Sequence, residues 1–363
     1  MKAMLCKEYG PPETLQLTEV SNPVAGKNQV VVSIKSCGVN FPDFLIIENK
    51  YQFKPALPFA PGAEVAGVVK SVGEGVTRFK PGDRVIASVG NGGMAEEVAV
   101  DAGRLIPMPD SMDFETGSAL ILTYGTSHYA LKDRAKLKPG DTLVVLGAAG
   151  GVGLAAVELG KAMGARVIAG ASSQEKVDLA KKHGADDGFV YPSGSLSRDQ
   201  QKELSETIKK LTGGNGADVL YDPVGGDYSE PAIRAMNWEG RFLVFGFAAG
   251  EIPKIPLNLT LLKSCDVLGV FWGAFTARNP KRNQEHLAEI AQWVAEGKIK
   301  PYISARFPLA RAGEAIRRLA ASRARVPGEG SAFATSLAQR FERADFAHGS
   351  IPLPFHPHGM TCG

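Results

Sequence analysis

A nine-residue segment of the 363-residue chain brings three chemically useful side chains close together. The segment "SCGVNFPDF", residues 36–44, contains the thiol of Cys37, the carboxamide of Asn40 and the carboxylate of Asp43. A thiol and a carboxylate can ligate zinc, whereas a carboxamide and a carboxylate can also bind or orient an organic substrate without a metal. Asn and Asp also hold turns through side-chain-to-backbone hydrogen bonds, so a purely structural role for this pair stays open.

The spacing of the cysteines argues against a metal or disulfide framework. Cys6, Cys37, Cys265 and Cys362 lie far apart, and no two of them form a C-x-x-C pair. Isolated thiols are typical of a reducing compartment. The start, "MKAMLCKEYG", lacks the apolar core of a signal peptide, and no apolar run is long enough to span a bilayer. We therefore expect a cytoplasmic protein without a membrane partner.

A second segment, "GAAGGVG" at 147–153, has the form of a phosphate-binding turn. It follows an apolar run and opens a helical pattern, although Ala148 replaces the first glycine of G-x-G-x-x-G. The second glycine of the motif lets the backbone approach a pyrophosphate, and the third lets the helix pack close to the strand. Free N–H groups at the helix start attract phosphate. The alternative is a tight turn without a ligand. The predicted contacts are Ala149, Gly150, Gly151, Val152 and Gly153.

The end of the next predicted strand indicates which dinucleotide binds. An NAD site places Asp or Glu there to hold the ribose 2′-hydroxyl, but this chain has Ala171. Ser172 can hydrogen-bond a 2′-phosphate, Lys176 can neutralise it, and Tyr191 ends the following strand. A lysine on an exposed helix is often merely solvated. Together with the missing acid, these residues favour NADP(H).

The elements that must position these residues follow two different sequence patterns. Short apolar runs separated by turn signals fill the first 120 residues or so, which predicts a β-rich barrel. Strands and helices then alternate, which predicts a doubly wound parallel sheet. Beyond about residue 268 the chain returns to short strands and one amphipathic helix, "EHLAEIAQWVAEG". In the alternating part we expect strands at 143–146, 188–191, 217–221 and 240–246, and helices at 175–183, 201–211 and 228–236.

The composition is that of an ordinary globular protein. Charged residues make up 22% of the chain, and the formal net charge is +3. This charge is small and dispersed, so we expect neither nucleic acid nor an acidic membrane surface as a partner.

Seven motifs together resemble the zinc-free quinone oxidoreductase group of the medium-chain dehydrogenase/reductase superfamily. They are "CGVNFPD", "PFAPGAEVAGVV", "FKPGDRV", "VVLGAAGGVG", "KKHGAD", "YDPVGGD" and "GRFLVFGFAAG". The resemblance spans residues 1 to about 325. It implies an α/β protein with a GroES-like β-rich catalytic domain at 1–122 and 268–325. A doubly wound Rossmann NADP-binding domain is then inserted at 123–267.

The resemblance also bears on the metal. Zinc-dependent members of the superfamily carry a cysteine where this chain has Asn40, and a histidine where it has Ala63. Neither a carboxamide nor a methyl group replaces thiolate and imidazole around zinc. Cys37 matches a non-liganding position, so we expect it to be a buried structural cysteine. The prediction is an enzyme without a metal.

Several further site residues are implied by the resemblance alone. Asn40, Asp43 and Tyr51 match family residues that face the nicotinamide, and Leu45 replaces a second tyrosine. We expect Tyr51 or Asn40 to bind the acceptor carbonyl, with Asp43 orienting the loop. Trp272 fits core packing equally well. The cofactor-binding positions that the resemblance implies are Thr126, Val224, Gly225, Gly246, Phe247, Phe271, Trp272 and, in the "SRA" segment, Arg323.

The chain departs from the family near its end. Relatives finish with a short β-strand that returns to the catalytic domain, whereas this chain continues with "RVPGEGSAF". We expect residues 326–363, rich in Gly, Pro, Ser and His, to form a disordered tail. Loss of the terminal strand would expose a sheet edge.

The implied function is hydride transfer from NADPH to a quinone or an α,β-unsaturated carbonyl, by a homodimer. Without a Lewis acid, hydride transfer suits an acceptor that is already electron-poor. Two alternatives remain open: an enoyl- or acrylyl-CoA reductase of the same fold, and a crystallin-like protein that binds the cofactor without turnover. A zinc alcohol dehydrogenase is disfavoured by Asn40 and Ala63.

Overall fold

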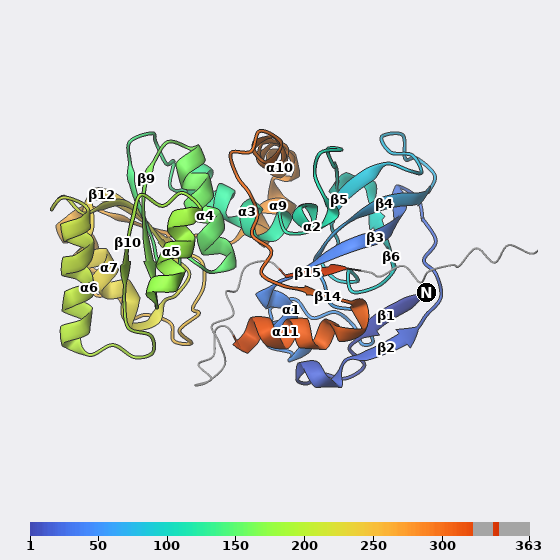
Figure 1. Cartoon of the computed structure of the whole chain (residues 1–363), viewed down its shortest axis with the longest axis horizontal. Helices are drawn as coiled ribbons and strands as arrows, with labels where there is room; N and C mark the ends of the chain where they lie inside the picture. The colour runs from blue at the N-terminus through green and yellow to red at the C-terminus, as the bar shows by residue number, and fades with distance from the viewer. Residues whose placement is uncertain (322–336, 341–363) are drawn as a thin grey trace, which may run out of the picture.

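Two large sheets divide the chain into two lobes, with the helices α3 and α10 between them (Figure 1). The computed structural model describes residues 1–321 and 337–340. The lobe on the left of Figure 1 contains the inserted Rossmann domain, and the lobe on the right contains the catalytic domain. The predicted fold class is confirmed.

The Rossmann domain is built on six parallel strands in the order β10-β9-β8-β11-β12-β13. Counted along the chain this order is 3-2-1-4-5-6, the order of dinucleotide-binding sheets. The strands are β8 (Thr142–Val145), β9 (Arg166–Ala171), β10 (Asp187–Val190), β11 (Ala217–Asp222), β12 (Met236–Val244) and β13 (Asp266–Gly269). The helices are α4 (Gly151–Ala162), α5 (Gln174–Lys182), α6 (Arg198–Leu211), α7 (Ser229–Arg234) and α8 (Asn258–Lys263).

Alternation along the central strand explains the two helical layers. Side chains of successive strand residues point to opposite faces of a sheet. Leu143 and Val145 belong to the core cluster that contains residues of α4 and α5. Val144 belongs to the cluster that contains residues of α6, α7 and α8. All three side chains are fully buried, which accounts for the continuous apolar run in the sequence.

The catalytic domain holds a larger, mostly antiparallel sheet in the order β14-β15-β3-β4-β5-β7, with β6 also paired to β3. A two-stranded sheet, β1-β2, completes it. The strands are β1 (Lys2–Leu5), β2 (Gln16–Glu19), β3 (Gln29–Val39), β4 (Glu64–Val72), β5 (Arg84–Ser88), β6 (Glu97–Asp101), β7 (Leu105–Pro107), β14 (Arg306–Phe307) and β15 (Leu337–Arg340). The helices of this domain and of the junction are α1 (Phe41–Ile47), α2 (Phe114–Gly117), α3 (Ile121–His128), α9 (Trp272–Arg278), α10 (Pro280–Ala295) and α11 (Ala312–Ala321). Short 3-10 turns lie at Pro12–Thr14, Ala102–Arg104, Gly226–Tyr228 and Leu309–Arg311, and a π-helical turn lies at Tyr129–Arg134.

Strand β15 differs from the expectation of a structureless tail over residues 326–363. Leu337–Arg340 pair antiparallel with residues 36–39 of β3 and parallel with β14. The long strand β3 pairs with β6 only over residues 29–33, so its last residues would otherwise present an open edge on that side. The four residues of β15 therefore close the edge that the departure from the family threatened. The other residues of this segment lie outside the described part of the chain.

Several element boundaries differ from the sequence-based prediction: α6, for example, begins at Arg198 instead of 201, and β12 ends at Val244 instead of 246. Helix α7 ends at Arg234 instead of 236, and β12 already begins at Met236, four residues early. The ladder between β11 and β12 contains a register shift, and Glu239 has φ +58°, so a strand continues through residues that the pattern placed outside it. Among residues 1–321, no helix is both long and apolar enough to cross a membrane.

Candidate active site

The loop that ends β3 is held by a buried carboxylate. Asp43 is 1% exposed, and its two oxygens accept hydrogen bonds from the backbone N–H groups of Asn40 (2.7 Å) and Gly62 (2.9 Å). Burial raises the pKa of Asp43 to about 6, although the two N–H donors oppose this shift. Asp43 therefore orients the loop through backbone contacts, as the sequence suggested.

The side chain of Asn40 is held by a residue that the sequence analysis did not select. Its Nδ2 donates to Oε1 of Glu64 over 2.7 Å, and Oε2 of Glu64 accepts from the backbone N–H of Leu122 over 2.9 Å. Glu64 is fully buried, and this burial raises its pKa to about 7. The available signal was an acid inside the apolar run "AEVAGVV", a position where an unpaired carboxylate is costly.

Tyr51 lies beyond α1 with its ring against the core of the catalytic domain. Burial, and then the nearby charge of Asp43, raise the pKa of its phenol. The hydroxyl has no hydrogen-bond partner within the described part of the chain. Tyr51 thus keeps a free donor beside the loop that carries Asn40 and Asp43.

The glycine turn has the geometry that its motif requires. Gly147 has φ +60°, and a Cβ on Gly153 would lie 2.2 Å from the Gly147 carbonyl oxygen. Gly153 must therefore be glycine for α4 to approach β8 this closely. Gly150 precedes the first residue of α4, so the N–H groups of Gly151 and Val152 lie in the first helical turn, where no intrahelical acceptor exists. Ala149 is buried within the same turn.

The end of β9 offers a cation and a hydroxyl, but no acid. Ala171 ends the strand and is 2% exposed. Nζ of Lys176 donates to Oγ of Ser172 over 3.0 Å, and burial lowers the pKa of this half-buried lysine. The two residues are therefore already paired.

Tyr191 lies away from Ser172 and Lys176, next to the glycine turn: it is buried, and its hydroxyl accepts a hydrogen bond from the Gly147 N–H over 2.9 Å. It supports the phosphate turn.

The loops after β11 and β12 converge at the same end of the sheet. The buried carboxylate of Asp222 accepts from the N–H groups of Val224 (2.8 Å) and Gly225 (2.9 Å). A Cβ on Gly225 would lie 2.9 Å from the ring of Phe247, so the two loops are in contact. Gly246 has open space where its Cβ would be. Ligands of doubly wound folds bind at these carboxyl ends.

The remaining predicted residues divide between the junction and the core. Thr126 lies on α3 in the junction between the lobes. Trp272 is 8% exposed and packs on Gly125, where a Cβ would lie 2.9 Å from its ring, so this side chain belongs to the core. Phe271 is 63% exposed. Arg323 lies outside the described residues.

Comparison with known proteins agrees with the observed fold. Residues 26–110 match the model of the alcohol dehydrogenase GroES-like domain, and residues 151–294 match the zinc-binding dehydrogenase model. A quinone oxidoreductase-like protein 2 homolog from Nematostella vectensis is 39% identical over 88% of this chain and 85% of its own length.

The chain belongs to the quinone oxidoreductase group of the medium-chain dehydrogenase/reductase superfamily.

Solved members of the superfamily share the whole architecture. A probable oxidoreductase from Mycobacterium abscessus is 36% identical, with a TM-score of 0.81 over 94% of this chain and 98% of its own. The Escherichia coli quinone oxidoreductase complexed with NADPH is 28% identical, with a TM-score of 0.80 over 94% of this chain and all of its own.

The positions of the zinc ligands in this superfamily carry no ligands here. Asn40 donates to Glu64, and Ala63 contributes only a methyl group. Cys37 is fully buried, as expected, and burial, followed by the charges of Asp43 and Glu64, raises the pKa of its thiol. Within residues 1–321, no three side chains of His, Cys, Asp or Glu form a group that could hold a metal ion.

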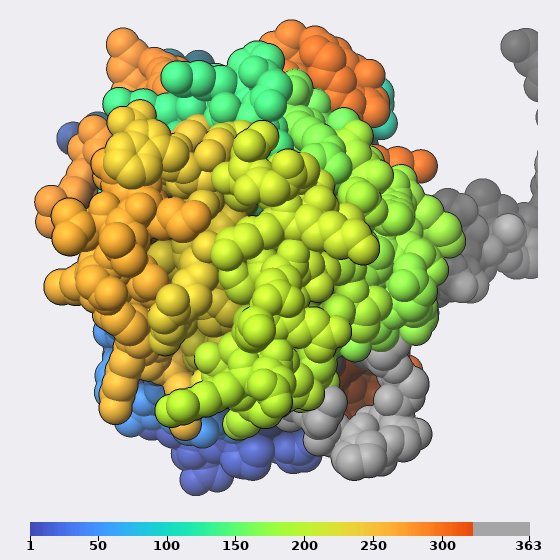
Figure 2. Space-filling view, turned by 90° about the vertical axis from the view of Figure 1, so that its left-hand side faces the viewer, coloured from blue at the N-terminus to red at the C-terminus, as the bar shows by residue number. Residues whose placement is uncertain are grey.

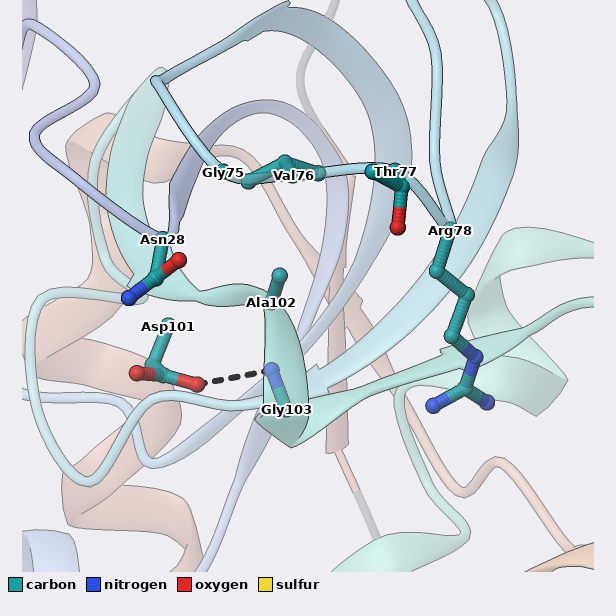
Figure 3. Close-up of a pocket in the computed structure, with 8 residues that line it drawn as sticks. All are labelled: Asn28, Gly75, Val76, Thr77, Arg78, Asp101, Ala102 and Gly103. Carbon is teal, nitrogen blue, oxygen red and sulfur yellow. Dashed lines mark hydrogen bonds between the residues drawn. The ribbon is translucent and has the colours of Figure 1, made fainter.

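One small hollow of the chain lies on the catalytic domain, away from the site described above (Figure 3). Its volume of about 240 Å³ is below the roughly 300–1,000 Å³ of typical small-molecule sites. Asp101 already accepts a hydrogen bond from the Gly103 N–H across it (2.7 Å). We assign no ligand to it. The lining residues are Asn28, Gly75, Val76, Thr77, Arg78, Asp101, Ala102 and Gly103.

Proposed function

We propose that this protein is an NADPH-dependent, zinc-independent reductase of quinones or α,β-unsaturated carbonyl compounds. The acceptor gains a hydride and one proton from solvent, and NADPH leaves as NADP⁺. The cofactor supplies the hydride; the protein supplies binding, orientation and stabilisation of the charge that develops on the acceptor oxygen.

The support for NADP(H) comes from both ends of its site. The turn at Gly150–Gly153 suits a diphosphate because three of its four residues are glycines and the first-turn N–H groups of α4 have no side-chain cap. Ser172 and Lys176 would hold the 2′-phosphate, and Ala171 offers no carboxylate to repel it. The E. coli relative complexed with NADPH has the same fold. Val224, Phe247 and Thr126 would border the nicotinamide half.

The acceptor side would be formed by Tyr51 and Asn40. The free hydroxyl of Tyr51 can donate a hydrogen bond to the carbonyl oxygen, where negative charge develops as hydride arrives. Asp43 would not touch the acceptor, since backbone N–H groups already occupy its oxygens. The proposal needs no zinc, because the polar donors take the role of the Lewis acid.

The observation that carries the proposal is the pairing of Lys176 with Ser172 at a strand end that lacks an acid. The experiment is a binding titration with NADPH and NADH, followed by NADPH oxidation against ortho- and para-quinones, enones and enoyl-CoA thioesters. We expect tighter binding of NADPH and turnover with the quinones or enones. Preference for NADH would contradict the cofactor assignment. Turnover of the thioesters alone would contradict the acceptor class.

We further propose a homodimer formed through the edge strand β13. Apolar side chains are exposed on and beside this strand: Leu257, Leu261, Leu262, Val267 and Phe271, with exposed fractions of 78, 78, 66, 46 and 63%. Figure 2 shows their segment as the light-orange surface along the left of the Rossmann domain. An open strand edge flanked by apolar side chains favours pairing with a second copy.

A further inference from the structure

Glu64 occupies a closed polar niche between the two halves of the proposed site. It begins β4, opposite Gly38 of β3, and is fully buried. A Cβ on Gly38 would lie 2.6 Å from Oε1 of Glu64 and 2.2 Å from the Ser118 carbonyl oxygen. Gly38 therefore leaves the space that the carboxyl group of Glu64 fills. Oε1 of Glu64 accepts from Asn40 Nδ2 and Oε2 accepts from the Leu122 N–H, and the backbone of Ile121 lies close enough to stabilise the same carboxylate.

The charge state of Glu64 decides how Asn40 can turn. An ionised carboxylate only accepts hydrogen bonds, so Asn40 must direct its NH₂ group to Oε1. A protonated carboxyl group donates one hydrogen bond. Because Oε2 still accepts from the Leu122 N–H, the proton resides on Oε1, and the amide oxygen of Asn40 is then the partner that satisfies the new O–H donor. The amide flips, and its NH₂ group turns away from Glu64.

We propose that Glu64 is a positioning residue for the acceptor site. Its charge state determines whether Asn40 presents its amide oxygen or its NH₂ group to the acceptor carbonyl. This inference rests on the proposed function. The NH₂ group stabilises the negative charge that hydride transfer creates on the acceptor oxygen, whereas the amide oxygen repels it. The protonated form of Glu64 is therefore the productive one.

The second oxygen of Glu64 connects this residue to the cofactor side of the proposed site. Leu122 lies in the first turn of α3, and Thr126 lies four residues later, on the same face of the helix. Glu64 thus connects the loop of the acceptor site to the helix that carries Thr126. A change in the charge of Glu64 should therefore affect both the acceptor side and the cofactor side of the proposed site.

The switch falls in the physiological range. Burial, opposed by its hydrogen bonds and reinforced by the charge of Asp43, raises the pKa of Glu64 to about 7. The ionisable groups around it are Asp43 on α1 and the thiol of Cys37 on β3, whereas α3 contributes backbone N–H groups. Activity should decline as the pH rises through about 7.

The experiment compares wild type with Glu64→Gln. In this variant the Gln oxygen accepts from Leu122 N–H and its NH₂ group donates to the Asn40 oxygen, which reproduces the protonated state at every pH. With saturating NADPH, kcat/KM of the wild type for a quinone should fall at least about tenfold from pH 6.5 to 9. Glu64→Gln should stay flat near the acid limit. Retention of the wild-type decline by this variant would overturn the proposal.

Two further variants separate positioning from other effects. Asn40→Ala should lower kcat/KM and lose the decline near pH 7, because Glu64 acts only through Asn40. Persistence of the decline in Asn40→Ala would also overturn the proposal. Glu158→Gln is the matched control: Glu158 is a buried carboxylate elsewhere, whose Oε2 accepts from Tyr124 (2.6 Å) and Lys300 N–H (3.0 Å) and whose Oε1 pairs with the His183 ring (2.5 Å). It should keep the wild-type pH profile.

A measurement without turnover keeps this inference distinct from the proposed function. The side-chain NH₂ resonance of Asn40, observed by NMR in protein labelled with ¹⁵N-asparagine and assigned with Asn40→Ala, should shift with a midpoint near pH 7. The shift should be absent in Glu64→Gln. If no acceptor is reduced, the proposed function fails while this titration still tests the control of Asn40. A resonance that does not titrate in the wild type would refute that control.

Discussion

Burial sets the chemistry of the residues at the candidate acceptor site. Asp43 and Glu64 are both within 1% of full burial, and their pKa values are raised to about 6 and about 7. Every carboxylate oxygen in this pair nevertheless has a protein N–H donor. The phenol of Tyr51 differs, since it has no partner in the described part of the chain. The carboxylates therefore organise the loop, and the hydroxyl of Tyr51 is the donor that we propose for the acceptor.

Replacing Tyr51 by Phe tests that assignment. Loss of a hydrogen-bond donor to a developing oxyanion costs about 10²–10³ in rate, so kcat/KM for the acceptor should fall about 100-fold. NADPH binding should be unchanged. Tyr9→Phe serves as the control, because the Tyr9 hydroxyl bonds to the Pro55 carbonyl instead (3.3 Å). Unchanged kcat/KM in Tyr51→Phe would remove this hydroxyl from the mechanism.

Lys176 should decide between the two nicotinamide cofactors. Lys176→Ala removes a charge-assisted hydrogen bond worth about 1.5–3 kcal/mol, so the Kd for NADPH should rise roughly 10- to 100-fold. The Kd for NADH, which lacks the 2′-phosphate, should stay the same. Lys182→Ala, an exposed lysine near the end of the same helix, should change neither value. Fluorescence titration measures all three proteins; equal losses for both cofactors would contradict the assignment.

The raised pKa of Glu64 also makes the stability of the fold depend on pH. Its value of 4.5 in the unfolded chain rises to about 7 in the fold. Its contribution to stability is therefore complete below pH 4.5 and is lost as the pH rises through 7. The difference of about 2.5 in pKa corresponds to roughly 3 kcal/mol.

Urea unfolding at several pH values tests this linkage. Between pH 4.5 and 8, the free energy of unfolding of the wild type should decline relative to that of Glu64→Gln by roughly 3 kcal/mol. The difference between the two proteins removes the contributions of the titrating groups that do not interact with Glu64. Parallel curves for the two proteins would show that Glu64 keeps its ordinary pKa.

At the scale of single elements, the closest backbone approach in the proposed cofactor site lies between α4 and the turn before it. A Cβ on Gly153 would lie 2.2 Å from the Gly147 carbonyl oxygen. Because this oxygen belongs to the backbone, the clash could not be relieved by the movement of a side chain. The first-turn N–H groups of α4 that would hold the diphosphate depend on this approach.

Gly153→Ala should therefore displace α4 and weaken NADPH binding by at least about tenfold, together with a lower Tm. Gly273→Ala in α9 is the control, because its Cβ would meet only the Phe271 ring at an ordinary 3.5 Å. Ala is the better helix former, so that variant should keep its stability. Normal NADPH affinity in Gly153→Ala would show that the turn does not depend on this glycine.

At the scale of the whole molecule, the two edges of the Rossmann sheet differ in their surroundings. Strand β10 forms one edge, and β13 forms the other, beside the exposed leucines of α8 and the segment before it. Both edges carry an exposed valine, Val190 (48%) and Val267 (46%). If the dimer forms through β13, a charge introduced at Val267 should weaken it, whereas the same charge at Val190 should not.

Val267→Lys should accordingly convert a dimer into a monomer of 38.5 kDa in light scattering coupled to size exclusion. Val190→Lys, which places the same charge on the opposite edge, should leave the dimer intact. A monomeric wild type, or a dimer that survives Val267→Lys, would contradict the proposed interface.

The sequence by itself determined those features that local patterns encode. Apolar periodicity located the alternating strands and helices, and the glycine spacing at 147–153 identified the phosphate turn, because both depend on neighbouring residues. The missing acid at Ala171 could likewise be found by its distance from the turn. Asn40 and Asp43 were also recognised together, since they lie only three positions apart.

Only the tertiary structure decided which distant residues meet. Glu64 lies 24 residues from Asn40 and 58 from Leu122, and no local pattern encodes these two hydrogen bonds. Strand β15 forms because β3 leaves an edge open almost 300 residues earlier in the chain. Trp272 is placed in the core by Gly125 across the junction, and Tyr191 reaches back to Gly147. Such contacts depend on how the elements pack, which periodicity within one element does not specify.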